Sequence, residues 1–179
     1  GYALVSRRVL ADDSVIDLGG GAAFGGPAIG VIAGPCSVES REQLLESATA
    51  VRAAGAVALR GGADKPRTSP YSFQGMGSDG LAILSEARAE TGMPFVTEVM
   101  TPEDVPAFAK AADMIQIGSR NMQNFRLLEA VGAERCPVLL KRGMMSTLDE
   151  FLAAAEYVYA LGNERIVPVS YTHLRAHET

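Results

Sequence analysis

Short apolar runs alternate with longer amphipathic segments along most of the chain. Each run is a few residues long and apolar throughout, and a helical pattern separates most neighbouring runs. Strands of a parallel sheet are buried on both faces, so they lack the alternation of half-exposed strands, and helices form their crossovers. The pattern therefore predicts an α/β protein built on a parallel sheet. The predicted strands are residues 28–33, 57–59, 95–97, 114–117, 138–140 and 165–167.

The segments between these runs carry signals for helix ends. Ser40, followed three residues later by Gln43, predicts a capping box at a helix that ends at Gly55. Thr147, followed by Glu150, predicts a second capped helix near the end of the chain. Three further helices are predicted. One covers residues 79–91, one begins at residue 101 and has a proline next, and one covers residues 124–131.

Reactive or charged side chains follow five consecutive predicted strands. A doubly wound sheet concentrates its ligand groups at one switch point, whereas a TIM barrel gathers every strand end around one mouth. The pattern therefore favours a TIM (β/α)8-type barrel. Such barrels have eight strands and about 250 residues, so we expect an incomplete barrel with about six strands. The strand-end residues are Cys36, Arg60, Glu98, Arg120 and Lys141.

The first residues differ in pattern from the rest. Residues 2–18 alternate apolar and polar side chains and run into a glycine-rich stretch, which predicts a short β-hairpin at one end of the domain. We therefore divide the chain into a hairpin with its glycine-rich connector (1–26), a partial barrel (27–167) and a tail (168–179).

The charge balance limits the classes of partner. The formal net charge is -5, so the chain lacks the diffuse positive field that gathers nucleic acids or anionic membranes. No apolar stretch approaches the length of a membrane span, and the first residues do not form a signal peptide. We expect a cytoplasmic protein without nucleic-acid or membrane partners. Cys36 and Cys136 have no spacing motif, which argues against a disulfide framework.

Positive charge is nevertheless concentrated at the predicted mouth. A planar guanidinium and a compact ammonium together suit a small ligand with several negative charges, so we predict a phosphorylated substrate. The alternative is that each cation pairs with a surface acid, and Glu98 could likewise pair with an arginine. The cations are Arg60, Lys65, Arg67, Arg120, Lys141 and Arg142.

The loop after the second strand has the composition of a phosphate-binding segment. Gly61 and Gly62 permit close backbone approach, and the prolines limit the loop's conformational freedom. The Gly-x4-Gly-Lys-Ser/Thr order of a Walker loop is absent. The donors that we expect to hold phosphate are Lys65, Arg67, Thr68 and Ser69.

Several motifs, in the same order, resemble the type I 3-deoxy-D-arabino-heptulosonate 7-phosphate (DAHP) synthases. The resemblance covers residues 2–167. The nearest related enzymes, the 3-deoxy-D-manno-octulosonate 8-phosphate synthases, usually have an Asn-Arg-Ser-type segment where this chain has residues 65–68. The motifs are Ile-Ala-Gly-Pro-Cys-Ser-Val-Glu (32–39), Leu-Arg-Gly-Gly-Ala-Asp-Lys-Pro-Arg-Thr-Ser-Pro-Tyr-Ser-Phe-Gln-Gly (59–75), Thr-Glu (97–98), Gln-Ile-Gly-Ser-Arg-Asn (116–121) and Leu-Lys-Arg-Gly (140–143).

The resemblance implies condensation of phosphoenolpyruvate with erythrose 4-phosphate, the entry step of the shikimate pathway and aromatic amino acid biosynthesis. It implies a metal-dependent enzyme that is homo-oligomeric at full length. Cys36 would be a ligand of a divalent metal of the Mn, Fe, Co or Zn class, and Lys65, Lys141 and Glu98 would be catalytic. Phosphoenolpyruvate would be bound by Arg60, Lys65, Glu98, Arg120, Lys141 and the backbone amide of Ser119, and the aldose phosphate by Pro66, Arg67, Thr68 and Ser69.

Residues 168–179 do not match the family pattern, and we interpret them as a frameshift or translated adapter sequence. His173 and His177 lie there, and their spacing alone does not predict a metal site. The family takes further metal ligands from a later part of its chain, so we expect this polypeptide to keep the substrate-binding half with little or no synthase activity. Two alternatives stay open: a synthase of an octulosonate or a sialic acid, and a non-catalytic domain that binds phosphoenolpyruvate.

Overall fold

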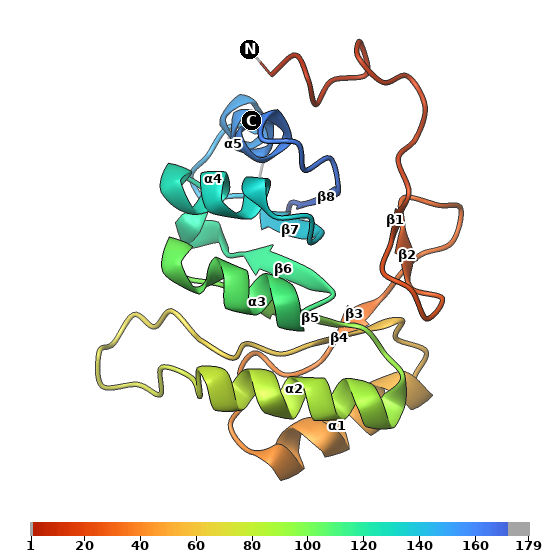
Figure 1. Ribbon diagram of the computed structural model, residues 1–179, viewed down its shortest axis with the longest axis vertical. Helices are drawn as coiled ribbons and strands as arrows, with labels where there is room; N and C mark the ends of the chain where they lie inside the picture. Colours follow the sequence, from red (N-terminus) through yellow and green to blue (C-terminus); the bar gives the residue numbers. More distant parts are fainter. Residues whose placement is uncertain (1, 172–179) are drawn as a thin grey trace.

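The computed structural model describes residues 2–171, and its core is a curled parallel sheet of six strands in chain order (Figure 1). Each strand pairs with the next strand along the chain, as in successive β/α units of a barrel. The predicted α/β class and incomplete barrel are confirmed. The strands are β3 (Ile32–Ala33), β4 (Ala58–Arg60), β5 (Phe95–Glu98), β6 (Met114–Ile117), β7 (Val138–Lys141) and β8 (Ile166–Val169).

β3 and β8 depart from the predicted bounds by more than one residue at one end, whereas the ends of the other four strands agree to within one residue. β3 has two residues, although the apolar run before it predicts a longer strand. A Cβ at Gly30 would lie 2.8 Å from the Phe24 ring, so this stretch packs closely against the hairpin. β8 continues past residue 167 to Val169.

Helices follow the strands where the sequence predicts them. Ser40 caps α1, since its Oγ accepts a hydrogen bond from Gln43 N at 3.1 Å, but Gln43 Oε1 accepts from Glu39 N instead of closing the box. Thr147 and Glu150 form the complete box at α5. The helices are α1 (Arg41–Ala53), α2 (Ser78–Thr91), α3 (Val105–Ala111), α4 (Phe125–Ala133) and α5 (Leu148–Ala160), with short 3-10 helices η1 (Pro102–Asp104) and η2 (Ser119–Asn121). No helix in residues 2–171 is long and apolar enough to cross a membrane.

The predicted hairpin is present but shorter than the alternating pattern suggests. Only β1 (Ile16–Asp17) and β2 (Ala23–Phe24) pair, in antiparallel register. Residues 2–15 form an irregular segment, and the amides of Leu4 and Val5 donate to the Glu156 carboxylate on α5. The hairpin lies on the opposite side of the sheet from the helices (Figure 1).

The two faces of the sheet bury different clusters. Leu59, Phe95, Ile115 and Leu140 face the helices and belong to the larger core. The other face carries a smaller cluster, called the inner cluster below, which the hairpin residues Leu18 and Phe24 cover from one side. The fully buried members of the inner cluster are Ile16, Ala58, Val96, Met114 and Leu139.

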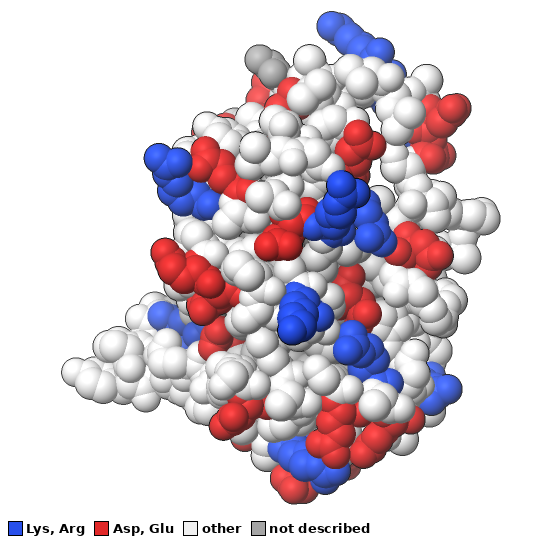
Figure 2. Space-filling model, in the orientation of Figure 1, with Lys and Arg blue, Asp and Glu red and all other residues white. Residues whose placement is uncertain are grey.

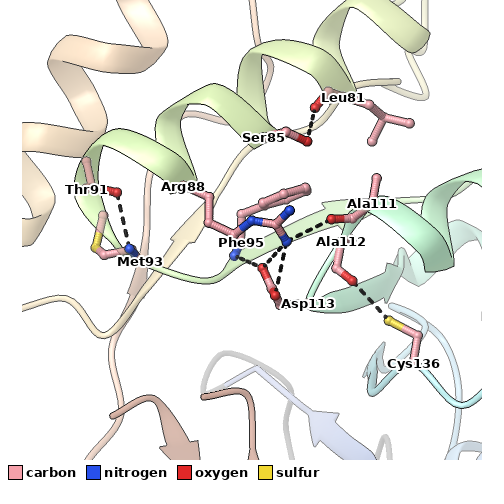
Figure 3. A network of polar contacts seen from close by, with 10 residues as sticks. All are labelled: Leu81, Ser85, Arg88, Thr91, Met93, Phe95, Ala111, Ala112, Asp113 and Cys136. Carbon is pink, nitrogen blue, oxygen red and sulfur yellow. Dashed lines mark hydrogen bonds and ion pairs between the residues drawn. The ribbon is translucent and has the colours of Figure 1, made fainter. Parts of the chain in front are cut away.

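The Asp113 carboxylate, in the residue before β6, forms an ion pair with Arg88 of α2 and accepts a hydrogen bond from the first amide of β5 (Figure 3). Asp113 Oδ2 accepts a hydrogen bond from Phe95 N at 2.9 Å and lies 3.1 Å from Arg88 Nη1. The Arg88 guanidinium also lies 5.1 Å from the centre of the Phe95 ring, a cation–π distance. The contacts therefore tie α2 to two neighbouring strands.

Candidate active site

The polar residues of the site lie on the same face of the sheet as the inner cluster. In each of four strands, a residue of the inner cluster is followed two positions later by a polar side chain. Residues i and i+2 of a strand lie on the same face, so these polar side chains form a layer above the inner cluster, at the carboxyl ends of the strands. The pairs are Ala58 with Arg60, Val96 with Glu98, Met114 with Gln116, and Leu139 with Lys141.

A cavity of about 190 Å³ opens at this layer. It receives side chains from strand ends and from the loops after β4 and β6, and six residues of the sequence prediction line it. Arg60, Cys36 and Glu98 line an adjoining crevice, so Glu98 borders both spaces. The six residues are Lys65, Pro66, Glu98, Ser119, Arg120 and Lys141.

Glu98 and Lys141 are the two charged side chains of the polar layer that line the cavity. Glu98 is 5% exposed and accepts a hydrogen bond from Gln116 Nε2 at 2.9 Å. Burial lowers the pKa of the Lys141 ammonium, and the nearby charges of Arg60 and Lys65 lower it further. The negative charge of Glu98 raises this pKa but does not cancel the other effects. A second anion in this cavity would therefore favour the protonated form of Lys141.

Cys36 lies beside two cations. Its Sγ is 3.7 Å from Arg60 Nη2. Burial alone would raise the pKa of the thiol, but the hydrogen bond from Lys65 and the charges of Lys65 and Arg60 outweigh burial and lower it. The site therefore favours a thiolate.

The described part of the chain does not form a metal site. Between residues 2 and 171, no three His, Cys, Asp or Glu side chains are grouped so that they could hold a metal ion. The charges that act on the Cys36 thiol come from Lys65 and Arg60 and would repel a metal ion, although the Glu98 carboxylate lines the same crevice. The assignment of Cys36 as a metal ligand therefore stays a prediction.

The loop after β4 projects from the molecule as an arm, defined as residues 65–75 (Figure 1). A bridge between Asp64 and Gly75 closes its base. Arg67, Thr68 and Ser69 are exposed on the arm and do not line the cavity. Arg120 links the arm to the cavity, because its Nη1 donates to Pro66 O at 3.4 Å and its Nη2 to Thr68 Oγ1 at 3.5 Å.

Arg142 does not belong to the cation group at the mouth, so that part of the sequence interpretation is wrong. It is 2% exposed, and its Nε and Nη2 donate to the carbonyl oxygen of Ser146. Lys141 ends β7 and lines the cavity, whereas the next residue, Arg142, holds the loop before α5 through these hydrogen bonds.

Two residues of the site, Gly118 and Tyr171, are not predicted from the sequence. A Cβ at Gly118 would overlap the Glu98 carboxylate, so the close approach requires glycine. Tyr171 also lines the cavity, and its hydroxyl lies 2.7 Å from Ser119 Oγ. Tyr171 belongs to the segment interpreted above as foreign, and His173 and His177 lie outside the described residues.

Two further hollows in the described part of the chain are not lined by the predicted site residues. One of about 370 Å³ lies between the N-terminal segment and α5, and another of about 410 Å³ lies beside Cys136. Burial raises the pKa of Cys136 to about 11. On the face drawn in Figure 2, acidic and basic side chains are interspersed.

The fold and the site together define an α/β barrel-type protein whose strand-end cations surround a small cavity. The family model described as the DAHP synthetase I family matches residues 14–179. The chain therefore belongs to the DAHP synthetase I family. The matched range includes residues 168–179, and their interpretation as a foreign tail stays a prediction.

Individual relatives agree with this assignment. The phospho-2-dehydro-3-deoxyheptonate aldolase of Thermotoga maritima is 54% identical over 93% of this chain and 49% of its own length. The 2-dehydro-3-deoxyphosphooctonate aldolase of Nitratidesulfovibrio vulgaris (strain DP4) is 38% identical over 76% of this chain and 53% of its own. The chain thus spans about half the length of these relatives.

Two solved structures share the fold. The crystal structure of the Thermotoga maritima aldolase, also titled DAHP synthase, has a TM-score of 0.87 and 53% identity, covering 92% of this chain and 48% of that one. A truncated form of the 3-deoxy-D-arabino-heptulosonate 7-phosphate synthase from the same organism has a TM-score of 0.84 and 47% identity, covering 98% of this chain and 64% of that one.

Proposed function

We propose that this chain carries the phosphoenolpyruvate-binding part of a DAHP synthase. Such an enzyme condenses phosphoenolpyruvate with erythrose 4-phosphate and releases phosphate. The observation that carries the proposal is that Lys65, Arg120 and Lys141 line one cavity together with Glu98. Phosphoenolpyruvate has a carboxylate and a phosphate, and ammonium and guanidinium groups bind both by charge-assisted hydrogen bonds.

The chemistry requires neutralisation of charge before bond formation. Both substrates are anionic, so cations reduce their mutual repulsion and hold them in reacting geometry. C3 of the enol attacks the aldehyde carbon, water adds at C2, and phosphate then leaves. We assign proton transfer to Lys141, whose lowered pKa makes the ammonium a better proton donor than an ordinary lysine, and orientation of the water to Glu98.

The second substrate is assigned to the arm. Arg67, Thr68 and Ser69 have the donors that bind an aldose phosphate, and Arg120 connects the arm to the cavity. Higher identity to the heptonate aldolase than to the octonate aldolases supports erythrose 4-phosphate over arabinose 5-phosphate. Binding with little turnover by this polypeptide stays our expectation.

Calorimetry with the purified chain tests the proposal. Phosphoenolpyruvate should bind, and erythrose 4-phosphate should bind the resulting complex more tightly than arabinose 5-phosphate. Lys65→Met and Lys141→Met should each weaken phosphoenolpyruvate binding by about tenfold to a hundredfold, since a hydrogen bond to a charged group contributes roughly 1.5–3 kcal/mol. Lys110→Met is the matched control, because Lys110 lies exposed on α3.

The outcomes separate the alternatives. Preference for arabinose 5-phosphate would favour an octulosonate synthase. Binding of phosphoenolpyruvate without binding of either aldose phosphate would favour a sensing domain. Absence of phosphoenolpyruvate binding would overturn the proposal. A synthase assay with added manganese completes the test, and turnover comparable to that of a full-length relative would contradict the expected low activity.

A further inference from the structure

Glu98 and Gln116 form a buried pair at the border between the cavity and the crevice. They are direct partners across β5 and β6 in the sheet register. Their exposed fractions are 5% and 3%, and Gln116 Nε2 donates to Glu98 Oε2 at 2.9 Å. The hydrogen bond therefore joins two side chains whose backbones the sheet already holds in place.

The other carboxylate oxygen is confined from a different direction. A Cβ at position 118 would overlap Glu98 Oε1, so this oxygen packs against the backbone of Gly118. Gly118 lines the cavity with Lys65 and Lys141, whereas Gln116 lines the crevice with Arg60. One oxygen of Glu98 thus bonds to Gln116, and the other lies on the cavity side.

We propose that Gln116 is a positioning residue that keeps the Glu98 carboxylate from pairing with Lys141. The inference rests on the proposed function, because the Lys141 ammonium is one of the groups assigned to phosphoenolpyruvate. A glutamine suits this role: its amide donates a hydrogen bond without adding charge and does not titrate. Without the donor, the buried carboxylate needs another partner, and the nearby cations provide one.

The consequence for binding follows from electrostatics. Glu98 already acts on Lys141, since its charge raises the pKa of that ammonium against burial and against Arg60 and Lys65; the Cys36 thiolate acts in the same sense as Glu98. A carboxylate that turns toward Lys141 raises this pKa further and competes with the anionic ligand for the same cation. Loss of Gln116 therefore weakens binding of phosphoenolpyruvate through Glu98.

Binding and titration of the full chain test the proposal. Gln116→Met keeps the approximate size of the side chain and removes the donor, while Gln116→Asn withdraws the amide from Glu98. We expect both variants to weaken phosphoenolpyruvate binding about tenfold in calorimetry. With Glu98→Gln already present, Gln116→Met should change the affinity less than twofold. Gln123→Met is the matched control, since Gln123 is exposed in the segment between η2 and α4.

A second measurement requires no ligand. The chain has lysines at positions 65, 110 and 141, so carbon-13 NMR of labelled lysine follows each ammonium separately. The pKa of Lys141 should rise in Gln116→Met and in Gln116→Asn, and stay unchanged in Gln123→Met. A role limited to packing would lower the thermal midpoint without moving this pKa.

The two proposals fail in different ways. If the unmodified chain does not bind phosphoenolpyruvate, the proposed function is wrong and the Lys141 titration alone decides the role of Gln116. If the chain binds it and the Gln116 variants bind equally well, the positioning role is wrong. The positioning role is also wrong if Gln116→Met weakens phosphoenolpyruvate binding equally in the unmodified chain and in the Glu98→Gln variant. Should Gln116→Met fail to fold, Gln116→Asn supplies both readouts.

Discussion

The Nη2 atom of Arg60 lies 3.7 Å from the Sγ atom of Cys36. With Lys65 it lowers the pKa of this thiol against the effect of burial, whereas burial raises the pKa of Cys136 to about 11. A lower pKa means a larger thiolate fraction at neutral pH, and the thiolate is the reactive form. At pH 7 we expect iodoacetamide to alkylate Cys36 at least about tenfold faster than Cys136, as followed by peptide mass spectrometry.

Arg60→Gln should slow the alkylation of Cys36 at pH 7, because it removes one of the charges that favour the thiolate. The rates of variant and unmodified chain should converge at a pH above both pKa values. Arg126→Gln is the control, since Arg126 pairs with Glu129 on the exposed side of α4. Equal rates for Cys36 and Cys136 would contradict this account of the site.

We expect Arg120 to help to hold the arm in position. The two hydrogen bonds from Arg120 are long, at 3.4 and 3.5 Å, so each contributes at the low end of about 0.5–1.5 kcal/mol. Trypsin can cut after Arg67, which is exposed. If cleavage follows local opening, Arg120→Gln should accelerate this cut by about two- to tenfold. An unchanged rate would show that the arm is held by its own bridge between Asp64 and Gly75.

Asp113 should contribute to stability because it joins Arg88 to the start of β5 (Figure 3). Asp113→Ala leaves the Phe95 amide without its acceptor, and we expect a loss of about 1–3 kcal/mol in the free energy of unfolding. Arg88 is 38% exposed, so solvent compensates much of its lost ion pair. The measurement is urea denaturation.

The control for Asp113 is an exposed ion pair. Glu129→Ala removes the partner of Arg126, whose side chain is 85% exposed, and should change stability by less than about 0.5 kcal/mol. Equal losses for the two variants would refute the bridging role of Asp113.

Most of the sheet could be predicted because its strands are apolar on both faces and end at polar residues. Which of two adjacent cationic residues faces the cavity could not be predicted: Lys141 ends β7 and lines the cavity, whereas the next residue, Arg142, is buried against Ser146. Gly118 was also not predictable as a site residue, because it is required by a side chain of the neighbouring strand. The hairpin is shorter than the alternation implies: residues 2–15 are irregular, and the amides of Leu4 and Val5 donate to Glu156 of α5 instead of pairing with a strand.

Crystallography of the chain with phosphoenolpyruvate tests the central claim most directly. The account predicts ligand density in the cavity of about 190 Å³, with its anionic groups within hydrogen-bonding distance of Lys65, Arg120 and Lys141. Density elsewhere on the molecule, or a ligand in this cavity that contacts none of these three side chains, would contradict it.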